Sequence, residues 1–282
     1  MIDKKIRSVL YVPGINERAM KKASTLPCDA IIFDLEDSVA PEQKDRARTL
    51  VRHTLFECDY GGRSLIVRIN RLDSSWGEDD IKSLVGTNID ALCIPKVESA
   101  KELDLVRSTM EIQFKSEMPI WVMIETPQGV IDVADIASAR GLHAIIMGTT
   151  DLSHRLGLEN RSEGNRAGLH YSLSKCVLTA KLVGVKMFDG VFLDITDAES
   201  FKIQCREAKD LGCDGKTLIH PSQVEIANEI FGPSLEDVER ARRILSAWEE
   251  ATAKGKAVAV VDNQLIELMH VEEAKQIVES YS

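Results

Sequence analysis

Two acidic residues in similar settings are the first candidates for chemistry. Glu125 in MIETPQG and Asp151 in GTTDLS each follow an apolar run, and the two runs are consecutive along the chain. With no His or Cys partner at metal-site spacing, two hard oxygen ligands favour Mg²⁺, with Mn²⁺ as the alternative, over zinc. Gly129 and Gly148 stand close by and would let a substrate approach the ion. We therefore predict that Glu125 and Asp151 hold a divalent cation.

Two basic residues follow neighbouring apolar runs. Arg68 stands in SLIVRIN, and its guanidinium is suited to binding a substrate carboxylate through two parallel hydrogen bonds. The alternative partners are the acids at the end of the preceding run, Asp34, Glu36 and Asp37. Lys96, at the end of ALCIPK, could instead form a Schiff base with a carbonyl substrate. Because carboxylates surround it, we do not expect a depressed pKa and favour a supporting cation.

Eight short apolar runs must position these side chains, and amphipathic helical stretches separate them. Most runs are continuous in Val, Ile and Leu, as in parallel strands covered on both faces. They span residues 7–13, 30–36, 64–70, 91–96, 119–125, 142–149, 189–195 and 213–220. This alternation predicts an α/β fold, a closed (β/α)8 TIM barrel, with an open doubly wound sheet as the alternative. In a barrel the carboxyl ends of all strands meet at one rim, where active sites lie.

The pattern changes after residue 230. Residues 235–254 read as a helix with Ser234 as N-cap, Asp237 at the third helical position and Gly255 ending it. A short hairpin-like piece and a final helix follow. We expect residues 1–230 to form the barrel with the active site, and residues 231–282 a helical extension that serves as a lid or in oligomerisation. The extension is too small to hold a core alone, so it must pack on the barrel or on a neighbouring subunit.

The bulk composition narrows the class of partner. The 282 residues are 44% hydrophobic and 28% charged, with a formal net charge of −10. Such an acidic chain argues against nucleic acid or an anionic membrane as partner. No run approaches the roughly 20 apolar residues of a membrane helix, and the N-terminal run is too short for a signal peptide. We expect a cytoplasmic protein, or one in an organelle matrix after processing, with its six cysteines reduced.

Several motifs, in order and nearly end to end, resemble the citrate lyase β-subunit-like branch of the HpcH/HpaI aldolase superfamily. They are RSVLYVPG, AIIFDLEDSV, VRIN, IPKVES, IETPQG, GTTDLS, LGCDGKTLIHPSQV and VVDNQLIELMHVEEA. The resemblance implies a (β/α)8 barrel, usually a homotrimer or hexamer, whose C-terminal segment covers the site of a neighbouring subunit. It also implies Mg²⁺ as cofactor and coenzyme A as part of the substrate, since family members cleave or form (citra)malyl-CoA or citryl thioesters.

The resemblance also assigns roles to single residues. Glu125 and Asp151 match the family's metal ligands, Arg68 matches its substrate-carboxylate arginine, and Glu36 and Asp37 match the acids around the metal-bound waters. The residues implied to contact substrate or CoA are Arg7, Arg68, Lys96 and, within the stretch from Asn16 to Lys22, Asn16, Lys21 and Lys22.

The tail departs from the family pattern. The family often reads D-G-K-M-I-D-x-P, where the second Asp is the proton-transfer residue supplied across the subunit interface. Here Glu267 stands at that Asp and Met269 at the Pro. Glu can also move a proton, but its extra methylene shifts the carboxylate, and a misplacement of about 1 Å can cost about a hundredfold in rate.

The expected activity is Mg²⁺-dependent carbon–carbon cleavage, or formation, of a 3-hydroxyacyl-CoA thioester, giving a 2-oxo acid and acetyl-CoA. Glu267 would transfer the proton. Three alternatives stay open. The same site could act as a thioesterase or malate-synthase-like enzyme, Lys96 could support a metal-free aldolase, or the chain could be a citrate lyase β subunit that needs an acyl-carrier partner.

Overall fold

The computed structural model describes residues 5–114, 117–158 and 166–281, and within them eight parallel strands form a closed barrel. The barrel strands are β1 (Ser8–Pro13), β2 (Ala30–Asp34), β3 (Ser64–Arg68), β4 (Ala91–Ile94), β5 (Ile120–Ile124), β6 (Leu142–Met147), β7 (Lys186–Asp189) and β8 (Gly215–Leu218). Each strand pairs with its sequence neighbour, and β8 returns to pair with β1, Ser8 opposite Lys216. This closure confirms the predicted (β/α)8 barrel and excludes the open sheet.

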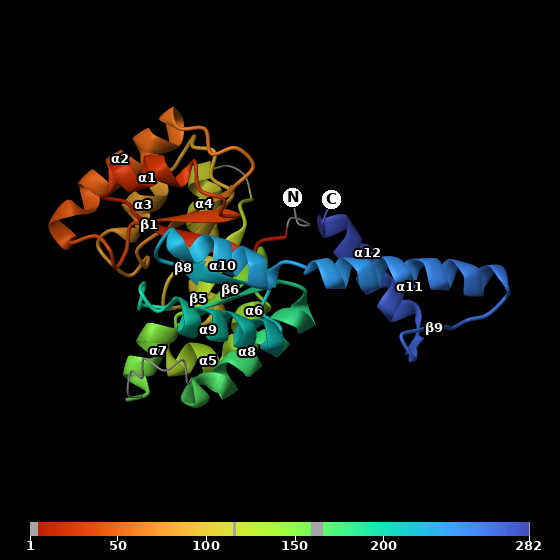
Figure 1. Ribbon diagram of the computed structural model, residues 1–282. Coiled ribbons are helices and arrows are strands. Elements are labelled where there is room, and N and C mark those ends of the chain that lie inside the picture. Colours follow the sequence, from red (N-terminus) through yellow and green to blue (C-terminus); the bar gives the residue numbers. More distant parts are fainter. Residues whose placement is uncertain (1–4, 115–116, 159–165, 282) are drawn as a thin grey trace. The chain divides into compact units, whose positions relative to one another are not determined.

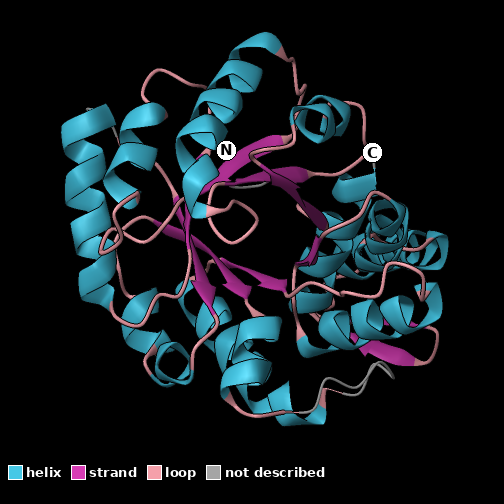
Figure 2. Cartoon of the chain, turned by 90° about the vertical axis from the view of Figure 1, so that its left-hand side faces the viewer, coloured by secondary structure: helices cyan, strands magenta, loops and turns pink. Residues whose placement is uncertain are grey.

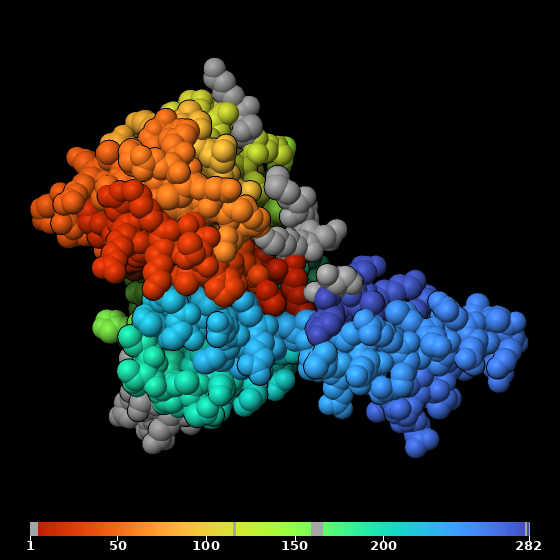
Figure 3. All heavy atoms as spheres, turned by 45° about the horizontal axis from the view of Figure 1, so that its top comes forward, coloured from red at the N-terminus to blue at the C-terminus, as the bar shows by residue number. Residues whose placement is uncertain are grey.

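The helices form the outer layer around the ring of strands (Figures 1 and 2). They are α1 (Glu17–Ala23), α2 (Lys44–Glu57), α3 (Gly77–Ser83), α4 (Ala100–Phe114), α5 (Pro127–Ile131), α6 (Val133–Ala137), α7 (Thr149–Arg155), α8 (His170–Val183), α9 (Ala198–Leu211) and α10 (Ser222–Phe231). The light-blue atoms of α10 lie against the red N-terminal segment in Figure 3. There Ser8 Oγ donates to Asn228 Oδ1 at 2.7 Å, and Asn228 Nδ2 donates to the Pro27 carbonyl at 2.7 Å.

The barrel interior is filled by apolar side chains from alternate strand positions. Val9, Ile32, Ile66, Met123 and Ile146 belong to one buried cluster of this kind. Successive side chains of a strand point to opposite faces, so a strand that contributes one core residue also directs the residue two positions later inward. In β1 and β3 the inward residues that follow this core are Tyr11 and Arg68. The core therefore positions the polar side chains at the carboxyl rim.

Two predicted strand boundaries are wrong near this rim. The run 189–195 is not a strand: β7 covers Lys186–Asp189, and a loop follows. A Cβ on Gly190 would lie 2.3 Å from Thr149 Oγ1, so this backbone passes directly against the start of α7. The run ending near residue 149 also stops earlier, because β6 ends at Met147 and Asp151 lies in the first turn of α7. Phe192 of this loop is buried against Phe201, so an apolar loop can have the composition of a buried strand, which explains the first error.

The chain divides into two compact units, Met1–Asn228 and Glu229–Ser282. The second contains α11 (Leu235–Ala253), the antiparallel pair β9 (Ala259–Val261) and β10 (Gln264–Ile266), and α12 (Leu268–Tyr281). The predicted N-cap is confirmed, and it forms a reciprocal capping box: Ser234 Oγ accepts from the Asp237 N–H at 3.0 Å, and the Asp237 carboxylate accepts from the Ser234 N–H at 2.9 Å. Ala241, Ile244 and Ile266 belong to the small core of this unit.

The structure provides no membrane-spanning segment among the residues that it describes. Within residues 5–114, 117–158 and 166–281, no helix combines the length and the apolarity needed to cross a bilayer.

Candidate active site

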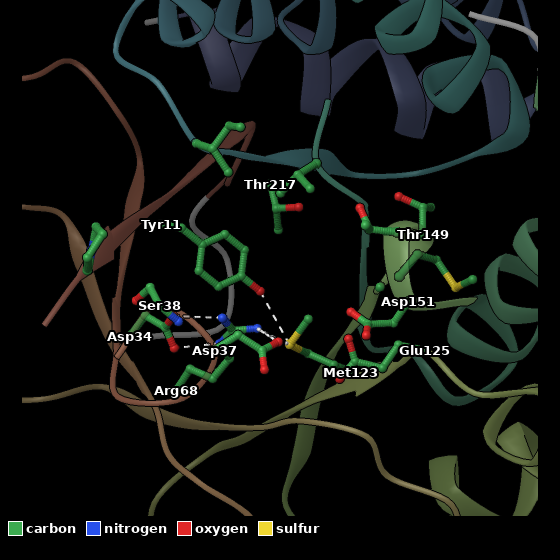
Figure 4. Close-up of a pocket in the computed structure, with 16 residues that line it drawn as sticks. Tyr11, Asp34, Asp37, Ser38, Arg68, Met123, Glu125, Thr149, Asp151 and Thr217 are labelled. Atoms are coloured by element: carbon green, nitrogen blue, oxygen red, sulfur yellow. Dashed lines mark hydrogen bonds and ion pairs between the residues drawn. The ribbon is translucent and has the colours of Figure 1, made fainter. Parts of the chain in front are cut away.

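A pocket of about 370 Å³ opens at the carboxyl ends of the barrel strands. It is lined by Tyr11, Pro13, Asp34, Asp37, Ser38, Arg68, Met123, Glu125, Met147, Gly148, Thr149, Thr150, Asp151, Val191, Thr217 and Ile219. Small-molecule sites typically have volumes of roughly 300–1,000 Å³ and combine apolar walls with a few polar groups. Figure 4 shows Asp34, Asp37 and Arg68 on one side of this pocket and Glu125 and Asp151 on the other. Because every lining residue belongs to the first compact unit, the barrel alone builds this pocket.

Glu125 and Asp151 lie side by side at one end of the pocket, with their carboxylates directed to the same space (Figure 4). Glu125 follows β5, where its Oε1 accepts the Lys96 backbone N–H at 2.7 Å. Its Oε2 is buried and has no hydrogen-bond partner among the described residues. Burial, with a further contribution from Asp151, raises the pKa of Glu125 to about 7. A buried oxygen without a partner beside a second carboxylate is costly unless a cation binds there, so these residues fit a divalent metal ion.

Gly148 creates the room for this pair. A Cβ at this position would lie 2.2 Å from both Cβ and Oε2 of Glu125, far inside any real contact distance. A side chain at residue 148 would therefore displace the Glu125 carboxylate. The predicted role of Gly148 was substrate approach, whereas the structure shows that its bare Cα makes room for the candidate ligand itself.

The charges of the pocket also favour a cation. Among the residues that line it, four are carboxylates, Asp34, Asp37, Glu125 and Asp151, and one is a cation, Arg68. Asp34 pairs with Arg68 and Asp37 with Lys96, which leaves Glu125 and Asp151 as the two lining acids without an ion pair among the described residues. An anionic substrate would be repelled from such a pocket. A divalent cation between Glu125 and Asp151 would remove most of this excess negative charge.

Arg68 enters the pocket from β3 with most of its hydrogen-bonding capacity already used. Its Nε and Nη2 donate to the two carboxylate oxygens of Asp34, each at 2.7 Å. Only Nη1 faces other groups: Glu36 Oε2 at 3.3 Å and Met123 Sδ at 3.5 Å. The alternative of a rim salt bridge is thus what the structure contains. A two-bond clamp on a substrate carboxylate would require the Asp34 pair to break, whereas a single bond from Nη1 would not.

Lys96 connects three acids of the site. Its Nζ contacts the carboxylates of Glu36 and Asp37, the latter at 3.1 Å, while its backbone N–H holds Glu125. Its φ of 53° lies in the left-handed region, which is uncommon for a residue with a side chain. Burial lowers the pKa of Lys96, but the bonds to Glu36 and Asp37 outweigh this and raise it. A lysine held in its charged form is a poor nucleophile, which disfavours the Schiff-base alternative.

A buried lysine that sequence analysis did not single out supports this rim from below. Lys44 Nζ donates to the backbone carbonyls of Leu35 and Glu36 and to Asn70 Oδ1, each at 2.8 Å. It therefore fixes the turn after β2 that carries Glu36 and Asp37. Its position in a helical stretch rich in charged residues contained no signal for this role.

Tyr11 is a second residue that the sequence analysis did not single out. Its ring packs against the guanidinium of Arg68, with Cζ 4.9 Å from the ring centroid, and its hydroxyl reaches Met123 Sδ at 3.4 Å. The alternation of the first strand places Tyr11 on the same face as Val9, and this was the available signal.

The predicted CoA-contact residues lie in different surroundings. Arg7 precedes β1, at the amino end of the barrel, and its Nε and Nη2 bond the Asp29 carboxylate at 2.9 Å. Arg7 therefore does not line this pocket, which opens at the opposite end of the strand, and its predicted contact with substrate or CoA stays a prediction. Asn16 caps α1 by accepting a hydrogen bond from the Ala19 N–H at 3.0 Å. Its side chain is exposed, and it lies three residues after Pro13, which lines the pocket.

The remaining basic candidates lie on the exposed surface of α1. Lys21 pairs with Glu17 at 2.8 Å and with Glu57 at 3.4 Å. Lys22 is also exposed, next to Lys21. Neither lines the pocket, so a contact with CoA would have to be made outside it.

Glu267 belongs to the second compact unit, between β10 and α12. Its side chain is exposed, and its backbone N–H donates to His270 Nδ1 at 3.0 Å. The role predicted for Glu267 stays a prediction.

Comparison with known proteins agrees with this arrangement. Residues 7–221 match the family model described as HpcH/HpaI aldolase/citrate lyase. The chain belongs to the HpcH/HpaI aldolase/citrate lyase family. Its family membership, predicted from the motifs, is thereby confirmed.

Two relatives within this family cover nearly the whole chain. One, "(3S)-malyl-CoA thioesterase" of Cereibacter sphaeroides, is 44% identical over 270 residues, which are 96% of this chain and 92% of that protein. Another, "Citrate lyase subunit beta" of Haemophilus influenzae, is 34% identical over 280 residues, which are 97% of this chain and 96% of that protein.

Two solved structures resemble this chain. The crystal structure of CitE from Mycobacterium tuberculosis, in complex with magnesium, acetoacetate and coenzyme A, superimposes with a TM-score of 0.82 at 28% identity. It covers 99% of this chain and 100% of that chain. A citrate lyase beta subunit from M. tuberculosis, complexed with oxaloacetate and magnesium, gives a TM-score of 0.72 at 29% identity over 82% of this chain and 99% of that chain.

Proposed function

We propose that this chain hydrolyses the thioester of a short 3-hydroxyacyl-CoA of the malyl type, with a divalent cation bound between Glu125 and Asp151. The observation that carries the proposal is the pair of carboxylates in one pocket, with a buried Glu125 oxygen that lacks a hydrogen-bond partner among the described residues. A cation bound there would act as a Lewis acid toward the oxygens of the substrate. The 44% identity to a (3S)-malyl-CoA thioesterase favours hydrolysis as the reaction.

The side chains of the pocket would divide the remaining work. Arg68 would bind one carboxylate oxygen of the substrate through Nη1, because its other nitrogens pair with Asp34. Glu36 and Asp37 would hold Lys96 in place, and the Lys96 N–H in turn orients Glu125. In hydrolysis, water adds to the thioester carbonyl carbon and the carbon–sulfur bond breaks. The sulfur leaves as the CoA thiol, and the free hydroxy acid is the second product.

Carbon–carbon cleavage, the reaction expected from the motifs, is the second candidate. The 34% identity to a citrate lyase subunit beta over 97% of the chain favours it. In this reaction the bond between the hydroxyl-bearing carbon and the α-carbon breaks, giving a 2-oxo acid and acetyl-CoA. Arg68 would hold the carboxylate that becomes part of the oxo acid. Both reactions use the same pocket, so the products decide between them.

We further propose that Glu267 supplies the proton-transfer group from a neighbouring subunit of a homotrimer or hexamer. Residues 231–282 would then cover the neighbour's pocket, with Asn16, Lys21 and Lys22 beside the CoA portion. The exposure of Glu267 on the small second unit supports this arrangement. In hydrolysis its carboxylate would accept a proton from the attacking water. In carbon–carbon cleavage it would protonate the α-carbon.

The test is product analysis with the purified chain on malyl-CoA and citramalyl-CoA stereoisomers, in Mg²⁺ and then in EDTA. We expect Mg²⁺-dependent release of free thiol without a 2-oxo acid. A 2-oxo acid and acetyl-CoA in equal amounts would establish the lyase instead. Glu125→Gln should abolish turnover, while Asp135→Asn, at an exposed acid on α6, should retain it. Turnover only with an acyl-carrier thioester would refute the proposal in favour of a partner-dependent subunit.

A further inference from the structure

Two hydrogen-bond donors in the pocket share one poor acceptor. The Tyr11 hydroxyl lies 3.4 Å from Met123 Sδ, and Arg68 Nη1 lies 3.5 Å from the same sulfur. Figure 4 shows both dashed lines meeting at this atom. A thioether is a weak acceptor, and buried donors without a good partner are costly. The two donors are therefore arranged for an acceptor stronger than the one they now have.

The Tyr11 hydroxyl is the donor without a strong acceptor, whereas Arg68 Nη1 also has a carboxylate beside it. Glu36 Oε2 forms an ion pair with Arg68 Nη1 at 3.3 Å, but among the described residues the Tyr11 hydroxyl bonds only to Met123 Sδ. Asp34 occupies the opposite edge of the guanidinium. Met123 Sδ is the one hydrogen-bond partner of the Tyr11 hydroxyl among the described residues. Burial raises the pKa of Tyr11 well above its ordinary value, so the phenol keeps its proton and can only gain from a negatively charged acceptor.

We propose that the Tyr11 hydroxyl and Arg68 Nη1 form a two-donor subsite for one oxygen of a substrate carboxylate or oxyanion, and that Met123 Sδ occupies it in the absence of substrate. Tyr11 crosses the barrel from β1 to reach β5, so the subsite lies between the Asp34–Arg68 pair and the candidate metal ligand Glu125. Met side chains rotate easily and tolerate displacement. A ligand oxygen that enters would replace a weak bond to sulfur with two stronger bonds to oxygen.

This inference rests on the proposed function, because it assigns the subsite to the same substrate. It explains how Arg68 can bind an anion while keeping its pair with Asp34: the second hydrogen bond comes from Tyr11 rather than from a second guanidinium nitrogen. It also predicts the class of ligand. A small anion with two or more oxygens, such as a 2-oxo acid or a dicarboxylate, can contact the cation with one oxygen and the subsite with another.

The test is calorimetric binding of oxalate, a compact dianion, to the full chain in saturating Mg²⁺. Tyr11→Phe should weaken oxalate binding by roughly 10- to 100-fold, the effect of losing one hydrogen bond to a charged oxygen, with Mg²⁺ affinity unchanged. Tyr60→Phe is the matched control, since its phenol is also buried but donates to the Met20 carbonyl at 3.1 Å, outside the pocket. It should bind oxalate like the wild type.

Met123→Leu provides a second measurement that does not depend on the stability of the Tyr11 variant. Removal of the sulfur should leave oxalate binding as tight as in the wild type, or tighter. Equal oxalate affinity in wild type and Tyr11→Phe, or a tenfold loss in Met123→Leu, would overturn the subsite and leave the proposed function intact. No oxalate binding by the Mg²⁺-saturated wild type would also overturn the subsite, while product analysis on the CoA thioesters tests the proposed function separately.

Discussion

Replacement of Glu125 by Gln should stabilise the metal-free protein at high pH while it removes the response to Mg²⁺. Burial raises the pKa of Glu125 from an ordinary value of 4.5 to about 7. The folded chain therefore holds this proton more tightly than the unfolded chain does. As a consequence, the free energy of unfolding of the metal-free wild type falls as pH rises from about 4.5 to 7. Gln keeps the shape of the side chain but never ionises.

The magnitude follows from the difference between the two pKa values, about 2.5. At 1.36 kcal/mol for each pKa unit, ionisation of Glu125 costs the folded state about 3 kcal/mol above pH 7. Glu125 is 1% exposed, so solvent screens little of this cost. Mg²⁺ at a concentration 100 times its Kd would raise the free energy of unfolding of the wild type by about 2.7 kcal/mol, because it binds only the folded state. The Gln variant should gain nothing.

The assay is urea unfolding of wild type and Glu125→Gln at pH 4.5 and pH 8, in EDTA and in Mg²⁺. In EDTA the variant should be more stable than the wild type at pH 8 and nearly equal to it at pH 4.5. In Mg²⁺ the difference at pH 8 should shrink or reverse. A variant less stable than the wild type at pH 8 in EDTA would refute the argument that Glu125 is an unsatisfied buried charge.

Three further changes test other parts of the site. Gly148→Ala should lower Mg²⁺ affinity about 10-fold or more by calorimetry, because the new methyl displaces Glu125; unchanged affinity would contradict this. Lys216→Met should cost roughly 1–3 kcal/mol in urea unfolding, because it removes one fully buried partner of Asp189 and leaves that carboxylate paired with Arg166 alone. An unchanged free energy of unfolding would show that the Lys216–Asp189 pair is dispensable. Borohydride treatment with pyruvate should leave the mass of the protein unchanged, because the carboxylates around Lys96 keep it protonated; an adduct mapped to Lys96 would revive the Schiff-base chemistry.

The strongest sequence signals came from local pattern. Continuous apolar runs and amphipathic spacers predicted the closed barrel, and Ser234 predicted the start of α11. The same pattern placed Glu125, Asp151 and Arg68 at one rim, because parallel strands in a barrel end on the same side. The structure brings all three into one pocket. These features depend on residue types and on the spacing of apolar residues, and both can be read directly from the sequence.

The tertiary structure decided which atoms of those residues remain available. Sequence suggested an Arg68 clamp for substrate, but packing against β2 commits two of its nitrogens to Asp34. Sequence placed Arg7 near substrate, but the direction of β1 puts it at the far end of the barrel, beside Asp29. The convergence of Tyr11 on Met123 depends on side chains that meet across the barrel from β1 and β5. Such contacts join positions more than 100 residues apart, and only the closed packing of the barrel brings them together.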